Sequence, residues 1–173
     1  MRRSVFSAAL LLTGFALATA PLSAQGFVGA GLSMPSGEYG DYAKSGWVVN
    51  AGFRPYQSAD KRMSIWAEGL YGSNKHDGAG DDKTNLFGGF GSVTYNLTAE
   101  ASAVPYVIGS AGYLVHSYKS GINSSFDDSA GGFGFGGGAG VGIKKLYLEA
   151  RYLTAKIDGG TTAFIMFTAG ITF

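Results

Sequence analysis

The sequence contains no cysteine and little charge, and each of these absences excludes a class of chemistry. Without cysteine the chain forms neither disulfides nor thiolate-based sites. Charged residues make up 14% of the chain, whereas a soluble domain typically contains about 25%. Basic and acidic residues are nearly balanced, at 13 and 12. There is therefore no basic surplus that would bind nucleic acid.

Long apolar runs are also missing, except near the start of the chain. Arg2 and Arg3 precede an apolar stretch over residues 5–18, and Leu22-Ser23-Ala24 offers a cleavage site; this is the pattern of a secretory signal peptide. The stretch is too short for the alternative, a lone transmembrane helix of about 20 apolar residues. We expect residues 1–24 to be removed on export and residues 25–173 to fold as one domain. The exported chain keeps 11 of the 13 basic residues against 12 acidic ones, a net charge near −1.

Glycine and aromatic residues are abundant, with 29 glycines and 14% aromatics. Apolar and polar residues alternate with a period of two, which is the pattern of strands whose two faces meet different surroundings. Eight such segments cover residues 26–34, 47–56, 63–72, 86–97, 104–116, 132–143, 146–156 and 163–173. Their lengths suit a tilted strand that crosses a bilayer, which needs about 9–11 residues.

The connections between these segments alternate in length. The long ones, rich in Gly, Ser, Asn and Asp, are 35–46, 73–85 and 117–131. The short ones are 57–62, 98–103 and 144–145, and the last connection on the long side, 157–162, is also short. Long loops at one end and short turns at the other are typical of outer-membrane barrels. The sequence therefore predicts an all-β fold, an eight-stranded antiparallel up-and-down transmembrane β-barrel.

Charged side chains share one face of the predicted strands. Arg54, Glu68, Glu149 and Arg151 all fall on the less apolar face. A lipid-facing Arg or Lys at mid-bilayer costs about 2–4 kcal/mol, so a barrel keeps charges in its lumen. We predict that these four residues form a buried, charge-balanced ion-pair network that fills the lumen, because buried charges require partners. A gate, or a narrow proton or solute path, is the alternative role of the same residues.

The opposite face of the strands is expected to contact lipid. Its predicted members are Trp47, Val49, Phe53, Ile65, Tyr71, Val107, Tyr113, Leu146, Leu148, Tyr152, Ile165, Phe167 and Ile171. Aromatic residues near strand ends are expected to form girdles at the membrane interfaces. Alternate glycines from Gly134 to Gly142 share the inner face of their segment. A bare glycine face leaves room in a narrow lumen for large side chains such as Tyr106, Tyr147 and Phe90.

Several motifs resemble those of known barrels. The alternating apolar residues that end at Phe173 resemble the signal by which outer-membrane proteins are taken up by the barrel-assembly machinery. Glu149-Ala150-Arg151-Tyr152 resembles the penultimate strand of small OmpA/OmpX-type barrels. Further similar stretches are Met34-Pro35-Ser36-Gly37, Gly46-Trp47, Pro105-Tyr106-Val107-Ile108-Gly109 and Gly138-Ala139-Gly140. In this order, residues 25–173 resemble the outer-membrane β-barrel domain family. The resemblance implies a place in the bacterial outer membrane, with lipid, lipopolysaccharide and the assembly machinery as partners.

Three motifs suggest chemistry but have simpler explanations. His116-Ser117 suggests a lipid-deacylating triad, but adjacent residues of a strand point to opposite faces. The pairs Asp81-Asp82 and Asp127-Asp128 suggest cation binding that bridges lipopolysaccharide, but solvated loop charge explains them better. The two lumen carboxylates have no nucleophile beside them in the pattern. The sequence therefore predicts no catalytic residue, no metal site and no cofactor.

The interpretation favoured by these observations is a monomeric barrel with a side-chain-filled lumen and a structural or surface-interaction role. Two other functions stay open: a narrow channel for small hydrophobic solutes and, with less support, a lipid A-modifying enzyme. A soluble lipocalin-like barrel is the alternative fold. It requires polar residues outside and an apolar lumen, the reverse of the distribution expected for Arg54, Glu68, Glu149 and Arg151.

Overall fold

The computed structural model describes residues 25–76, 81–98, 101–121, 128–157 and 159–173, and these residues form one closed barrel. The expected signal peptide over residues 1–24 lies outside the described residues. The strands are β1 (Gly26–Ser36), β2 (Gly46–Gln57), β3 (Met63–Lys75), β4 (Lys83–Asn96), β5 (Val104–Lys119), β6 (Asp128–Ile143), β7 (Leu146–Ile157) and β8 (Gly160–Thr172). A short 3-10 helix, η1 (Gly37–Asp41), follows β1. No helix in the described ranges is long and apolar enough to cross a membrane.

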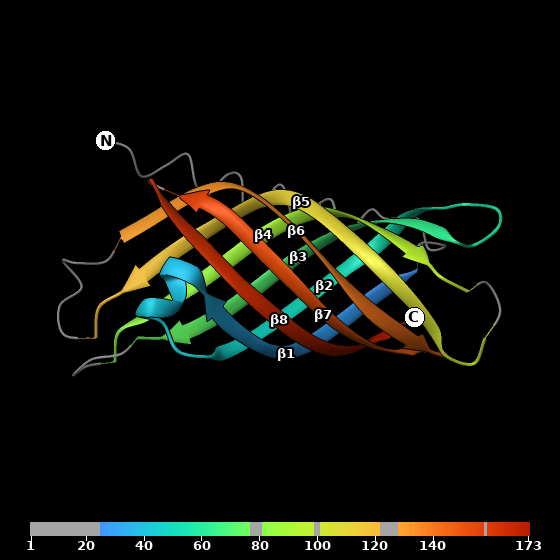
Figure 1. Ribbon diagram of the computed structural model, residues 1–173, viewed down its shortest axis with the longest axis horizontal. Helices are drawn as coiled ribbons and strands as arrows, with labels where there is room; N and C mark the ends of the chain where they lie inside the picture. Colours follow the sequence, from blue (N-terminus) through green and yellow to red (C-terminus); the bar gives the residue numbers. More distant parts are fainter. Residues whose placement is uncertain (1–24, 77–80, 99–100, 122–127, 158) are drawn as a thin grey trace.

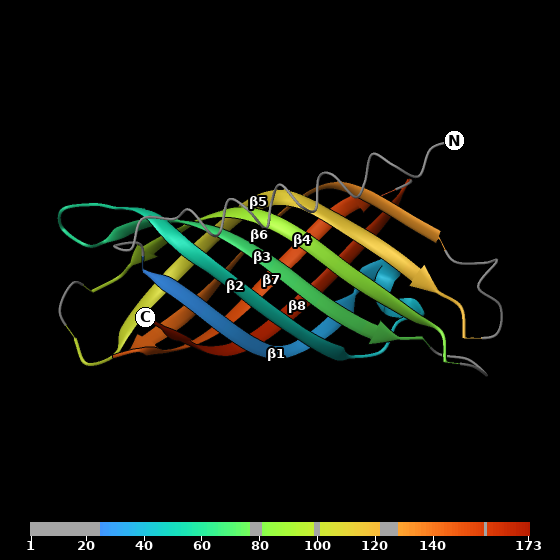
Figure 2. The ribbon, with the colours of Figure 1, turned by 180° about the vertical axis from the view of Figure 1, so that it is seen from behind.

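The eight strands follow one another around the barrel in chain order, and every neighbouring pair is antiparallel. β1 pairs with β8 over ten residue pairs, from Phe27 opposite Thr172 to Ser36 opposite Ala163, and this pairing closes the sheet. All strands are strongly tilted relative to the long axis (Figures 1 and 2). The predicted eight-stranded antiparallel up-and-down barrel is confirmed.

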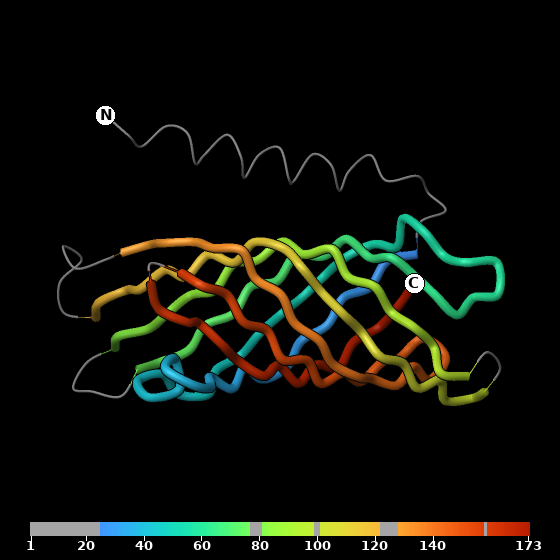
Figure 3. Tube along the Cα trace, turned by 45° about the horizontal axis from the view of Figure 1, so that its top comes forward, coloured from blue at the N-terminus to red at the C-terminus, as the bar shows by residue number. Residues whose placement is uncertain are grey.

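The two ends of the barrel differ, and we name them by the elements they hold. At the proximal end β1 begins, β8 ends, and the links after β2, β4 and β6 turn the chain. At the distal end η1 folds over the barrel mouth beside β1 and β8. Figure 3 shows the C-terminus at the proximal end and η1 at the opposite end.

The strands reach further at the distal end than the sequence pattern predicts. The predicted loop 117–131 contains the last residues of β5 and the first residues of β6, and β4 begins at Lys83 instead of at residue 86. Polar residues there continue the ladder: Ser117 pairs with Ser129, and Thr84 pairs with Tyr118. The prediction of long loops was wrong in these places because a polar composition was interpreted as irregular backbone.

One irregularity interrupts the proximal end of β2. The register between β2 and β3 shifts between Phe53 and Tyr56. The shift contains Pro55, which lacks the N–H group that a ladder bond requires. Arg54 therefore lies within a distorted segment.

The distal half of the lumen is mainly apolar, and the proximal half is mainly polar. The distal half is packed with buried apolar side chains, namely Tyr39, Ala43, Val48, Leu70, Leu86, Phe90, Leu114, Leu153, Ala155, Ile157, Phe164 and Met166. The proximal half is polar and holds the charged residues. Most large apolar side chains that remain exposed are on the outer face, for example Phe135 at 61% and Leu148 at 55%.

Candidate functional site in the barrel lumen

A three-residue ionic cluster crosses the lumen between β3 and β7. Arg151 donates from Nε to Glu149 Oε1 at 2.9 Å and from Nη1 to Glu68 Oε1. The same Nη1 group donates to Ser110 Oγ at 3.1 Å, and Ser92 donates to Glu68 Oε1. The Arg151 side chain is only 2% exposed. A buried guanidinium with this many charge-assisted bonds holds opposite walls of the barrel together.

Arg54 does not join this cluster, although the sequence placed it in the same network. It lies in the lumen at the proximal end, with its guanidinium 5.4 Å from the centre of the Trp66 ring. No described carboxylate lies within ion-pairing distance of Arg54. The distorted end of β2 gives the physical reason. The predicted charge balance was therefore wrong: the cluster has two carboxylates and one guanidinium.

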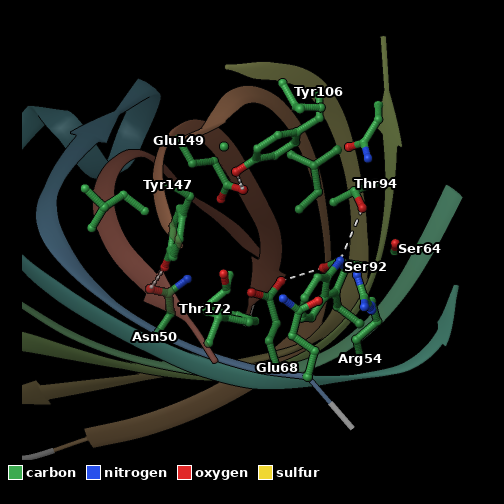
Figure 4. A pocket seen from close by; sticks show the side chains of 18 of the residues that line it. Asn50, Arg54, Ser64, Glu68, Ser92, Thr94, Tyr106, Tyr147, Glu149 and Thr172 are labelled. Atoms are coloured by element: carbon green, nitrogen blue, oxygen red, sulfur yellow. Dashed lines mark hydrogen bonds between the residues drawn. The ribbon is translucent and has the colours of Figure 1, made fainter. Parts of the chain in front are cut away.

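The proximal half of the lumen encloses a cavity of about 340 Å³. Its lining includes Asn50, Arg54, Ser64, Trp66, Glu68, Ser92, Thr94, Tyr106, Tyr147, Glu149, Arg151 and, at the end of the barrel, Gln25, Asn96, Lys144 and Thr172. Figure 4 shows Glu68 and Glu149 on facing walls of this space, with Tyr106 and Tyr147 beside Glu149. The cavity reaches the proximal end of the barrel, where residues of the strand ends line it. On the distal side it is closed by the apolar core.

Two tyrosines and one asparagine shape the wall of this cavity. Tyr106 donates its hydroxyl to Glu149 Oε2 at 3.0 Å, and Tyr147 donates to Asn50 Oδ1 at 3.3 Å. Asn50 is 3% exposed, and its Nδ2 group has no hydrogen-bond partner. Glycine makes room for both rings. A Cβ on Gly140 would lie 2.4 Å from Tyr106 Cζ, as the alternate glycines of this strand predict. For Tyr147 the room comes from β8, where a Cβ on Gly170 would lie 2.4 Å from Cε1.

A second polar cluster, at the distal end, contains both histidines of the chain. His76 Nε2 lies 2.7 Å from Thr84 Oγ1, and His116 Nε2 lies 3.4 Å from the same oxygen. His116 Nδ1 also contacts Thr162 Oγ1 at 3.1 Å. The fully buried ring of Tyr39, from η1, packs against His116. The sequence pattern did not predict this cluster, because the composition of residues 73–85 is typical of a loop.

Burial controls the ionisation of groups in this distal cluster that lie outside the strands. Burial lowers the pKa of His76, and the nearby Asp82 carboxylate opposes that effect. Burial likewise raises the pKa of Tyr39. Bonds donated by the Tyr118 hydroxyl, at 2.6 Å, and by the Gly121 N–H, at 2.7 Å, lower the pKa of Asp82. These shifts favour the neutral form of His76 and the ionised form of Asp82 at the distal mouth.

The residues expected to contact lipid all lie on the outer side of their strands. Ten of them are more than a third exposed: Trp47, Val49, Ile65, Val107, Tyr113, Leu146, Leu148, Tyr152, Phe167 and Ile171. Phe53, Tyr71 and Ile165 are half-buried by their neighbours. The Trp47, Tyr71 and Phe87 rings form a continuous aromatic row, with ring centres 5.2 and 4.6 Å apart.

The remaining candidate residues do not converge on a reactive site. His116 bonds inside the barrel while Ser117 follows it on the other face, so the two do not form a dyad. Asp81 Oδ1 lies 3.8 Å from Lys75 Nζ. Asp128 is the first residue of β6, and Asp127 lies outside the described residues. Within the described ranges, no three acidic, histidine or cysteine side chains come together as a metal site.

Comparison with known proteins finds the same fold in solved structures. No family model matches the chain, and no curated protein matches it. Ail, the attachment invasion locus protein of Yersinia pestis, is 13% identical with a TM-score of 0.56, over 88% of this chain and 100% of that chain. Neisserial surface protein A (NspA) is 18% identical with a TM-score of 0.64, over 86% of this chain and 95% of that chain. Ail in a phospholipid bilayer nanodisc is 14% identical with a TM-score of 0.53, over 87% and 100%. The shared feature is the eight-stranded barrel fold.

Proposed function

We propose that the protein is an integral barrel of the bacterial outer membrane, with a closed lumen and a structural or surface-interaction role. The observation that carries this proposal is the distribution of side chains. The ionic cluster of Glu68, Glu149 and Arg151 is enclosed, whereas large apolar residues such as Phe135 and Leu148 are exposed. A water-soluble barrel of the lipocalin type would have the opposite distribution.

The backbone supports the same proposal. Lipid offers no hydrogen-bond partners, so a spanning sheet must pair all its strands, and only a closed barrel does so. The β1–β8 pairing leaves no free edge. Similarity to Ail and NspA, and the resemblance of the sequence motifs to small OmpA/OmpX-type barrels, agree with this assignment. The proximal end would face the periplasm, and the distal end with η1 would face the outside.

The closed lumen favours a non-conducting, non-enzymatic role over the channel alternative. Val48, Leu86, Leu114, Leu153 and Phe164 are each no more than 1% exposed and fill the distal half. A solute that entered the proximal cavity would meet this apolar core. A role at the cell surface then depends on the distal end, which is the part presented to lipopolysaccharide and to other molecules. We propose a monomer that needs no cofactor.

Assembly would use the C-terminal strand. Phe173 is 68% exposed, and its backbone exchanges two hydrogen bonds of 2.9 Å with Gly26 at the β1–β8 seam. An exposed terminal aromatic residue next to the closing seam fits the proposed recognition by the assembly machinery. Replacing Phe173 with Ala should lower the yield of folded protein in the outer membrane, and an unchanged yield would contradict this part of the proposal.

Purified protein tests the membrane assignment directly. We expect the barrel, refolded into detergent or lipid vesicles, to migrate differently on a gel before and after boiling, because a closed barrel resists the detergent until it is heated. We also expect no single-channel steps in a planar bilayer. Identical migration before and after boiling, or a regular conductance, would contradict the barrel or its closed lumen respectively.

A further inference from the structure

The ionic cluster in the lumen carries an uncompensated negative charge. Glu68 and Glu149 share one guanidinium, that of Arg151, while Arg54 lies over Trp66 outside ion-pairing distance. The three side chains of the cluster are each at most 5% exposed. Burying a net charge is costly unless a partner neutralises it. Arg54 and Lys144 also line the cavity, but neither forms an ion pair with a described carboxylate. The cluster itself therefore has room for one more positive charge.

Two polar atoms at the cavity wall are also available for a further bond. Glu68 accepts the bonds from Ser92 and Arg151 at Oε1, and these two bonds leave Oε2 available to accept another. Asn50 Nδ2 is a donor without an acceptor, although Asn50 is 3% exposed and lines the cavity. Native proteins pair nearly all buried polar groups. The wall thus offers one carboxylate acceptor and one amide donor to a bound molecule.

The volume and the aromatic lining of the cavity indicate the size and chemical class of that molecule. Its volume of about 340 Å³ is near the lower end of the range for small-molecule sites, roughly 300–1,000 Å³. The side chains of Phe27, Trp66, Tyr106 and Tyr147 supply aromatic surface to the lining. Phe27 contacts both Trp66 and Tyr147 edge to face, with ring centres 5.4 and 5.9 Å away, which keeps these rings in place. Aromatic faces attract cations and pack against the C–H face of a sugar ring.

We propose that this cavity binds a small organic ammonium compound that also carries hydroxyl oxygens, of the class of an amino sugar, entering from the proximal end. The ammonium group pairs with Glu68 Oε2 and adds the missing positive charge to the cluster. A hydroxyl oxygen accepts from Asn50 Nδ2, and the ring packs against the tyrosine faces. Arg54 lines the same cavity, where its guanidinium is a further donor to hydroxyl oxygens. The proposal rests on the lumen alone and does not depend on a surface role.

The chain provides its own fluorescent reporter for this site. It has two tryptophans, of which Trp66 lines the cavity and Trp47 is on the outer face. In a Trp47→Phe background in detergent, Trp66 emission is titrated with glucosamine, N-acetylglucosamine and glucose at about pH 6, where an ordinary amine is protonated. We expect a saturable change with glucosamine and at least tenfold weaker binding of the two neutral sugars. No saturable change with glucosamine, or equal affinity for all three sugars, would overturn the proposal.

Two substitutions then locate the bound ammonium group. Glu68→Gln should weaken glucosamine binding at least tenfold, because it removes the charge that the ammonium group pairs with. Glu38→Gln, at the distal end, is the matched control and should leave binding unchanged. If Glu68→Gln does not fold, Asn50→Leu keeps the ionic cluster and should still reduce the affinity. A folded Glu68→Gln or Asn50→Leu variant that binds glucosamine as tightly as the parent would place the sugar elsewhere and refute the assigned site.

Discussion

Arg151 on β7 and Glu68 on β3 form an ion pair across the whole width of the barrel. Their strands are four positions apart in a closed sheet of eight, so no pair of strands lies further apart. The contact therefore links walls that share no backbone hydrogen bonds. Glu149, two residues from Arg151 on the same strand, holds the guanidinium in the orientation that reaches Glu68.

Replacing Arg151 with Met should destabilise the barrel strongly. The substitution leaves Glu68 and Glu149 buried without their cation, and removing one partner of a buried pair costs about 3–5 kcal/mol. Unfolding by urea from lipid vesicles, followed by tryptophan fluorescence, measures this cost. The triple variant Glu68→Gln, Glu149→Gln, Arg151→Met is the control, since it removes every charge of the cluster and should recover most of the stability. A single variant as stable as the parent would show that the cluster does not hold the walls together.

Replacing Gly140 with Ala should also destabilise the barrel, by about 1–3 kcal/mol, which is typical of overpacking. The new Cβ would lie 2.4 Å from Tyr106 Cζ and 2.6 Å from the Leu148 carbonyl oxygen. Gly109→Ala is the matched control on the outer face, where a Cβ meets nothing within 4 Å. That variant should be neutral or more stable by up to about 1 kcal/mol. Equal effects of the two substitutions in the urea experiment would contradict the packing role of the inner glycines.

The alternation of side chains was sufficient to predict the fold and the inner face of each strand. It placed Glu68, Glu149 and Arg151 on the inside, because a period of two assigns every residue of a strand to a face. It did not show which charges meet, because that depends on the stagger between strands β3 and β7. Arg54 has the correct face but lies in the distorted end of β2, so its guanidinium reaches Trp66 and not a carboxylate.

The distal histidine cluster shows the limit of composition as a guide to loops. Thr84 and His116 lie on the inner face of β4 and β5, where they bond to each other. The same alternation, continued past residue 72 and before residue 86, would have placed Asn74 and Thr84 inside. Polar inner residues were interpreted as loop residues because the connections were identified by their content of Gly, Ser, Asn and Asp.

Replacing Phe167 with Arg tests the membrane orientation. Phe167 is 46% exposed near the middle of β8, and an Arg facing lipid near the bilayer centre costs about 2–4 kcal/mol. Leu146→Arg is the matched control, because Leu146 is equally outward but begins β7 at the proximal end, where the cost falls to about 0–1 kcal/mol. Urea midpoints in lipid vesicles give both values. Equal, small losses in the free energy of unfolding at the two positions would contradict the assignment of Phe167 to the lipid-facing middle of the barrel.

Acidification should loosen the distal end through His76. Burial lowers the pKa of this residue below its ordinary value of 6.5, against the opposing effect of Asp82. The unfolded chain then binds a proton more readily than the folded one, so this contribution to stability is complete above about pH 6.5 and decreases as the pH falls below it. Asp82 has a lowered pKa, so its own contribution is lost only below about 3.8 and does not interfere between pH 8 and 5. The His76 ring packs against the rings of Tyr42 and Tyr118. His76 and His116 also share a hydrogen-bond partner, Thr84 Oγ1.

The test compares urea midpoints of the parent and of His76→Gln at pH 8, 6.5 and 5. The glutamine keeps a side chain that bonds to Thr84 but does not titrate, while His116 is unchanged in both proteins. We expect the parent midpoint to fall between pH 8 and 5 and the variant midpoint to fall less. The corresponding difference in the pH dependence of the free energy of unfolding should be that of less than one bound proton. Hydrogen exchange of the η1 amides should report the same loosening locally, because Tyr39 and Tyr42 pack against the two histidines. The same pH dependence in both proteins would show that His76 is not the group that responds.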